Sequence, residues 1–199
     1  MNDIKYFNKW NLDGVTVTDL GLKDYISLSP KIVPKTGAKY AGNRFHKSRV
    51  SIVERFINKL MIPGHKAKKH FKTSGSITGK AQTTLKIMED VLTVIETKTK
   101  ENPIAVLVSA IENAAPREEI IAIEYGGARY PKAVECAPQR RIDLAMRWIT
   151  QSSYQKAFNS KTSIVDALAN EIIHAYNLSN QSAAISKKYD TERQADSSR

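Results

Sequence analysis

The residues best suited to chemistry in this sequence are three histidines in one lysine-rich stretch, His46, His65 and His70. Imidazole is a good metal ligand, but the surrounding lysines repel a cation, and no carboxylate lies near enough in the sequence to complete a site. We therefore expect no metal site and no cofactor.

Two further patterns resemble catalytic motifs, but both lack essential residues. The stretch GSITGKA is similar to a phosphate-binding loop, yet Ser74 stands at the first glycine position and Ala81 replaces the hydroxyl that would bind magnesium. The sequence has no GxSxG elbow for a serine nucleophile, and Gly126-Gly127-Ala128 is not a dinucleotide fingerprint. The sequence thus predicts no enzymatic activity and no small-molecule substrate.

The dominant chemical signal is a block of positive charge. Between Lys31 and Met88 the sequence has 14 lysines and arginines and one acid, Glu54, in a chain whose net charge is +11. Such a block repels itself unless a polyanion neutralises it, which favours a nucleic acid as the partner. The basic residues are spread over several segments rather than one helix, and this distribution suits folded RNA better than duplex DNA. Rings that could stack on unpaired bases belong to Tyr40, Phe71 and Tyr130.

Compartment and thiol chemistry follow from two absences in the sequence. No apolar run approaches the ~18 residues of a membrane span, and the first residues lack the apolar core of a signal peptide. We therefore expect a cytoplasmic protein that does not contact a membrane. The single cysteine, Cys136, has no disulfide partner in the chain, and we interpret it as a packing residue rather than a reactive thiol.

The elements that carry these residues are expected to be mainly helical. Apolar residues at helical spacing and local capping signals predict a single helical bundle of about six helices. The expected helices cover Ser48–Ile62, about Lys80–Lys100, Pro103 (capped by Asn102) to Pro116, the segment after Pro138, a segment from the capping box Ser163 to Asp166, and part of a polar tail with a disordered end.

A two-stranded β-hairpin is expected at about residues 119–135, between the third and fourth helices. Gly126 and Gly127 suit a two-residue turn with positive φ at both positions. In that register Glu124 faces Arg129 and Ile123 faces Tyr130. A hairpin of this kind is marginal in water, so it leans on the helices or on an external partner, and a plain connecting hairpin remains an alternative.

The chain before Asn43 contains scattered prolines and glycines and predicts an extended N-terminal arm, residues 1–43, that folds onto a partner. Residues 44–199 then form the helical RNA-binding domain. The five lysines of HKAKKHFKTSGSITGK are expected to lie in a basic loop. Two readings of Trp148 stay open: packing in the core, or a place among the RNA-binding arginines of its helix.

Several of these motifs together resemble the universal small-subunit ribosomal protein seven family, in its archaeal-type form. The resemblance rests on NPIAVLV, NAAPREE, YGGARY and APQRR, which occur in this order, and it covers about residues 44–199. It implies a structural protein of the small ribosomal subunit that binds the 3′ major domain of the ribosomal RNA and organises assembly of the head. It also implies a hairpin near the transfer RNA exit site and the messenger path, with other small-subunit proteins as neighbours.

The predicted RNA-contacting residues combine the resemblance with the charge pattern. They are Arg44, Lys47, Arg49, His65, Lys66, Lys68, Lys69, Lys72, Lys80, Arg129, Tyr130, Lys132, Arg140, Arg141 and Arg147, with Gly126 and Gly127 forming the turn. The alternative function is a free-standing regulatory protein that binds RNA or DNA.

Overall fold

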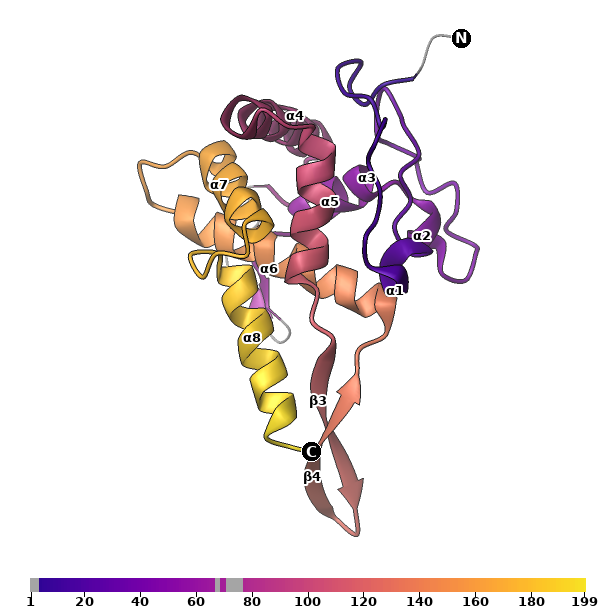
Figure 1. Cartoon of the computed structure of the whole chain (residues 1–199), viewed down its shortest axis with the longest axis vertical. Helices are drawn as coiled ribbons and strands as arrows, with labels where there is room; N and C mark the ends of the chain where they lie inside the picture. Colours follow the sequence, from indigo (N-terminus) through magenta and orange to yellow (C-terminus); the bar gives the residue numbers. More distant parts are fainter. Residues whose placement is uncertain (1–3, 67–68, 71–76) are drawn as a thin grey trace.

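The computed structural model describes residues 4–66, 69–70 and 77–199, with the backbone alone for residues 65–66 and 69–70. Helices α4 to α7 form a compact body, the β3–β4 hairpin projects from one end, and α8 runs beside the base of that hairpin (Figure 1). The helices are α1 (Leu20–Lys23), α2 (His46–Arg49), α3 (Ile52–Leu60), α4 (Ala81–Thr99), α5 (Pro103–Ala114), α6 (Pro138–Ala157), α7 (Ile164–Tyr176) and α8 (Ala183–Asp196). The strands are β1 (His65–Lys66), β2 (Lys69–His70), β3 (Glu118–Tyr125) and β4 (Ala128–Glu135).

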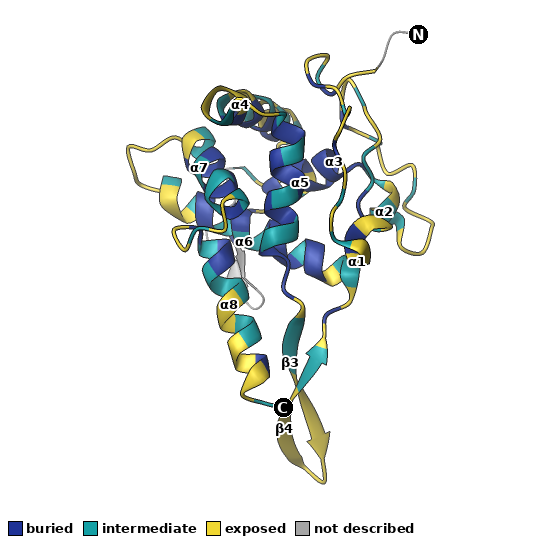
Figure 2. Cartoon of the chain, viewed as in Figure 1, coloured by how far each residue is buried: buried dark blue, intermediate teal, exposed yellow. Residues whose placement is uncertain are grey.

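The mainly helical fold with a projecting hairpin is confirmed, and six of the eight helices in the described residues correspond to the expected ones. The other two, α1 and α2, are single turns of four residues that carry little periodic signal. The core runs through the centre of the body along α3 to α7, whereas the outer part of the hairpin is exposed on both faces (Figure 2).

Local capping explains why several boundaries match the sequence prediction. The side chain of Asn102 accepts a hydrogen bond from the amide of Ile104 at 3.0 Å, with Pro103 at the first helical position of α5. The Ser163 hydroxyl accepts from the amide of Asp166 at 3.0 Å and begins α7. These signals involve neighbours in the chain, so they could be identified without knowledge of the fold.

The helix expected near Ser48–Ile62 is present but shorter: α3 begins at Ile52, and the residues before it belong to the separate turn α2, which ends at Arg49. Ser51 forms a parallel bridge with Ser27, and the amide of Ile52 donates to the carbonyl of Ser27 at 2.9 Å. The backbone at the break is therefore extended and pairs with a distant segment. As a consequence, α2 is a separate element that does not continue the line of α3.

The segment before Asn43 packs on the helical body of its own chain. It is largely irregular, as expected for an arm, but five of its apolar side chains are buried in the common core: Tyr6, Trp10, Val15, Leu22 and Ile26. The prediction that it folds onto a separate partner is therefore corrected for this part of the arm, because its own helices cover it. The domain boundary at residue 43 stays a prediction.

Polar contacts tie the same segment to three parts of the body. The Trp10 indole donates to Glu96 of α4 at 3.0 Å, and the amides of Thr18 and Asp19 both donate to Glu112 of α5. The buried Tyr6 hydroxyl lies in hydrogen-bonding contact with the Ser29 carbonyl and the Ser51 hydroxyl.

The hairpin has the expected register and turn. Glu124 pairs with Arg129 and Ile123 with Tyr130 across β3 and β4. Gly126 and Gly127 have φ of 58° and 80°, in the left-handed region where a side chain is strained. The two-residue glycine turn therefore fixes which side chains share each face.

The disordered end expected for the C-terminal tail is wrong, because α8 continues to Asp196 and packs against β3. The Arg199 guanidinium donates to both carboxylate oxygens of Glu118 at 2.7 Å, and the Arg117 amide donates to Glu192 at 2.9 Å. These contacts hold α8 along the base of the hairpin.

The segment expected as a basic loop contains backbone pairing. Strands β1 and β2 run antiparallel, with His65 opposite His70 and Lys66 opposite Lys69, so the backbone groups of these residues find partners in each other. The predicted contact residues Lys68, Lys72 and Phe71 lie outside the described residues.

Candidate nucleic-acid interface

A pocket between α2, α3 and α6 brings together basic residues from distant parts of the chain. It encloses about 270 Å³. Its lining residues are His46, Lys47, Val50, Arg55, Asn58, Lys59, Asp143, Met146 and Arg147. Of the predicted contact residues, Lys47 and Arg147 therefore meet here, although about one hundred positions separate them in the sequence.

Asp143 holds the three elements of this pocket together. One carboxylate oxygen accepts from Lys47 of α2 and the other from Arg55 of α3, both at 2.9 Å. Arg55 also donates to the carbonyl of Gln139 at 3.3 Å. Burial acts to raise the pKa of Asp143, but the hydrogen bonds and charges of Lys47 and Arg55 outweigh it, so the pKa is lowered. The carboxylate therefore stays ionised and is fully used by two cations.

The arginine pair at the start of α6 is engaged within the chain. Arg140 grips both oxygens of Glu119 on β3, at 2.5 and 2.6 Å, and its side chain remains about half exposed. Arg141 is buried and donates to the carbonyl of Pro116 at 3.0 Å and to Asp19 at 2.7 Å. Arg141 therefore joins the N-terminal segment to the base of the hairpin, and it offers little surface to a partner.

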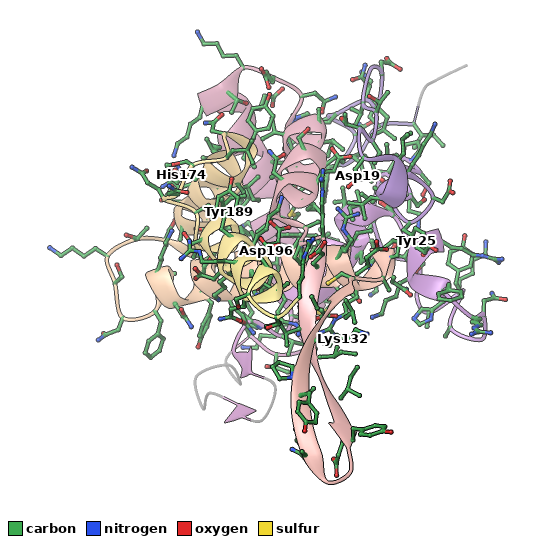
Figure 3. The ribbon with its side chains drawn as sticks, turned by 60° about the horizontal axis from the view of Figure 1, so that its bottom comes forward. Asp19, Tyr25, Lys132, His174, Tyr189 and Asp196 are labelled. Carbon is green, nitrogen blue, oxygen red and sulfur yellow. The ribbon has the colours of Figure 1, made fainter. Side chains whose placement is uncertain are left out.

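One face of the outer hairpin presents apolar and aromatic side chains to solvent. Opposite pairs in the register place Ile121, Ile123 and Tyr125 on the face of Lys132 and Tyr130. Tyr125 is 81% exposed and Tyr130 is 58% exposed. Sequence reasoning selected Tyr130 and Lys132 but missed the other three, which the two-residue alternation of β3 could have identified. Figure 3 labels Lys132 on the hairpin.

The remaining predicted contact residues lie on several elements. Arg44, just before α2, and Arg49, at its end, are both exposed. The Arg44 guanidinium lies 5.3 Å from the centre of the Phe45 ring. Lys80 is exposed at the start of α4, and Arg129 is exposed near the hairpin turn with a 3.4 Å ion pair to Glu124. For His65, Lys66 and Lys69 the structure gives only the positions along β1 and β2.

Three residues whose roles were in question belong to the folded body. Trp148 packs against the core, which confirms the packing alternative. Cys136 is buried and its pKa is raised to about 11, first by burial and then by Glu119, so the thiol is protonated at neutral pH. His174 is half-buried on α7, where Figure 3 labels it, consistent with a surface or packing role.

The described part of the chain offers neither a metal-binding cluster nor a membrane-spanning helix. No group of three or more His, Cys, Asp or Glu residues within 4–66, 69–70 and 77–199 could hold a metal ion. None of the helices in those ranges combines the length and apolar character that a membrane span needs.

Comparison with known proteins places this basic, hairpin-bearing helical fold in one family. The family model for ribosomal protein S7p/S5e matches residues 22–199. A protein of Nanoarchaeum equitans named small ribosomal subunit protein uS7 is 48% identical over 196 residues, which cover 98% of this chain and 99% of that protein. Proteins with the same name from Methanothrix thermoacetophila and Methanococcoides burtonii are 44% and 43% identical, over 98% of this chain and 100% and 99% of theirs.

The chain therefore belongs to the ribosomal protein S7p/S5e family, in agreement with the resemblance read from its motifs. These relatives are archaeal, which also agrees with the archaeal-type wording of the motifs. The alignments extend well before Asn43, so the N-terminal segment, which the motifs left unassigned, shares the similarity.

Proposed function

We propose that this protein is a structural, non-enzymatic constituent of the small ribosomal subunit in the cytoplasm and that it binds small-subunit ribosomal RNA. Membership in the ribosomal protein S7p/S5e family over residues 22–199 is the observation that carries the proposal. The net charge of +11 and the exposed arginines around α2 support it, since they supply the positive surface that RNA phosphates require.

We further propose that the RNA partner is the 3′ major domain and that the protein organises assembly of the subunit head, next to other small-subunit proteins. The outer hairpin would then lie near the transfer RNA exit site and the messenger path. Tyr125 and Tyr130 support this part of the proposal, because exposed rings on one face can stack on unpaired bases.

Sedimentation of the native protein tests the main proposal. We expect it to comigrate with small subunits in a one-to-one ratio, and a protein found only free or on its own messenger would favour the regulatory alternative. In a second test, the double variant Arg44→Glu, Arg49→Glu is compared with Lys161→Glu for binding to a transcript of the 3′ major domain. The double variant should bind much more weakly at constant helical circular dichroism, and equal binding by all proteins would contradict the assignment of this surface.

The hairpin is tested separately from assembly. Replacing Tyr125 and Tyr130 with alanine should leave binding to the transcript unchanged, because both rings are far along the exposed part of the hairpin, and should weaken retention of transfer RNA at the exit site. Loss of head assembly in this variant would show that the proposed division of roles is wrong.

A further inference from the structure

Two cations in the pocket between α2, α3 and α6 have no anionic partner of their own. Lys59 and Arg147 both line it, and neither forms an ion pair with another residue among those that the structure describes. The nearby carboxylate of Asp143 is already held by Lys47 and Arg55. The local charge is therefore unbalanced, with four cationic side chains around one acid.

The surroundings of Lys59 also indicate an excess of positive charge in the pocket. Its pKa is lowered, first by burial and then by the positive charge of Arg147, with Lys47 adding to the effect and Asp143 opposing it. Holding a half-buried ammonium beside a guanidinium costs free energy. An anion between the two would remove that cost and strengthen both contacts.

The rest of the pocket has the character of a site for a flat polar ring. The Asn58 side chain is exposed, and no hydrogen bond joins it to the other described residues, so its amide can both donate to and accept from a ligand. Val50 and the buried Met146 supply apolar wall, and His46 supplies a ring. The volume of about 270 Å³ lies just below the range of about 300–1,000 Å³ that is usual for drug-sized ligands, so the pocket suits one small group.

We propose that this pocket takes one nucleotide of an RNA chain, with its phosphate between Lys59 and Arg147 and its unstacked base beside Asn58. Proteins commonly recognise RNA through unpaired bases that turn out of the stack and form hydrogen bonds along their edges. The inference rests on the proposed function, and it adds a defined site to a general basic surface. An acidic peptide is the competing ligand, because a carboxylate also pairs with these cations.

The break between α2 and α3 accounts for the pocket structurally. The extended backbone at Val50 separates α2 from α3 and leaves Val50 in the wall. The ion pair of Lys47 with Asp143 then keeps α2 against α6. The departure from the predicted continuous helix is thus the feature that forms the site.

The first test compares binding to the 3′ major domain transcript for the wild-type protein and the variants Lys59→Gln, Arg147→Gln and Lys161→Gln. We expect about a tenfold loss for each pocket variant, as for one lost charge-assisted contact, and less than a twofold change for Lys161→Gln. The control residue Lys161 is exposed and follows the C-terminal end of α6, whereas the pocket is lined by the first half of that helix. Lys59→Gln removes a repulsion, so its stability should not fall. Equal losses in all three variants would overturn the proposal.

The second test titrates the protein, labelled with ¹³C in its lysines, with four probes: nucleoside 5′-monophosphates, inorganic phosphate, nucleosides and a hexaglutamate peptide. The monophosphates should shift the Lys59 signal at lower concentration than inorganic phosphate and raise the pKa of Lys59. Asn58→Leu should abolish that advantage over phosphate. Phosphate acting as well as the nucleotides, or a response to hexaglutamate alone, would overturn the proposal.

The two tests also separate this inference from the function on which it rests. If the wild-type protein fails to bind the transcript, the proposed function fails. If the transcript binds, while neither Lys59→Gln nor Arg147→Gln weakens it and no nucleotide shifts Lys59, the nucleotide site alone is wrong.

Discussion

At the scale of single residues, adjacent arginines in this chain have different physical roles. Arg140 lies at the surface and grips Glu119, whereas Arg141 points into the body and joins Asp19 to the base of the hairpin. Both were predicted as RNA contacts from the motif APQRR. The environment of each guanidinium, rather than its charge, therefore decides how much a substitution lowers the free energy of unfolding.

Arg141→Gln should lower the free energy of unfolding by about 2–3 kcal/mol, because it leaves the partly buried Asp19 carboxylate without its cation and the Pro116 carbonyl without its donor. Arg140→Gln is the matched control, and it should cost at most about 1 kcal/mol because the Arg140 side chain is about half exposed to water. Urea unfolding of both variants measures the difference. Similar losses for the two would contradict the structural role of Arg141.

The lowered pKa of Asp143 predicts a pH dependence of stability. A carboxylate with a depressed pKa in the folded state contributes stability that is fully present above its unfolded pKa of about 3.9. That contribution is lost as the pH falls through the folded value. The stability difference between the wild-type protein and Asp143→Asn should therefore be largest above about pH 5 and shrink toward pH 2.

Measuring the free energy of unfolding against pH for both proteins tests this. Asp19 also has a lowered pKa, so the comparison with Asp143→Asn is needed to isolate one carboxylate. A difference that stays constant from pH 6 to pH 2 would show that Asp143 is not stabilised by its cations.

At the scale of elements, local signals identified the structures that depend on near neighbours. The caps Asn102 and Ser163 and the glycine turn were visible in the sequence, since each acts within a few residues. The break between α2 and α3 was not visible, because the extended backbone there is set by Ser27, more than twenty residues earlier.

The candidate site could be predicted only in part, because local signals were visible in the sequence and long-range contacts were not. Charge density indicated α2 and the basic segment, but it did not show that Arg141 would be buried. Helical spacing held one clue: Arg141 lies one turn before the buried Ala145, on the inward side of α6. Lys59 was missed because its significance comes from Arg147, which only the fold brings near.

The turn of the hairpin gives a prediction about local stability. Gly127→Ala places a side chain at φ of 80° and should cost about 1–2 kcal/mol in the hairpin. Because the outer strands are exposed, the body should keep its unfolding free energy, while amides near the turn exchange about tenfold faster. Gly42→Ala is the control, as its φ is ordinary and its Cβ would meet nothing within 4 Å. Hydrogen exchange distinguishes the two, and a global loss of stability in Gly127→Ala would contradict this independence.

At the scale of the whole molecule, the arrangement combines a helical body that has one common core with a projecting, exposed hairpin (Figure 1). Exposed basic side chains lie at α2 and at the start of α4, while the hairpin carries exposed aromatic rings at its far end. Under the proposed function, this separation would let RNA binding and the contacts proposed for the hairpin be altered independently.

The overall charge sets how binding responds to salt. If about 6–10 phosphates are neutralised, affinity for the 3′ major domain transcript should fall by roughly 10³ to 10⁵ between 50 and 200 mM salt. Filter binding across that range measures the slope. An almost flat response would contradict an interface based on phosphate contacts.

The contacts of the N-terminal segment also affect the order in which the protein folds during synthesis. Trp10 is hydrogen-bonded to Glu96, Thr18 to Glu112, and Asp19 to Arg141. In each contact the partner of the N-terminal residue is synthesised much later. During synthesis this segment emerges before α4, α5 and α6, so its packing surface is incomplete until α6 has left the exit tunnel. Packing of this segment is therefore a late event in folding, and of these three contacts the one with Arg141 is the last that synthesis makes possible.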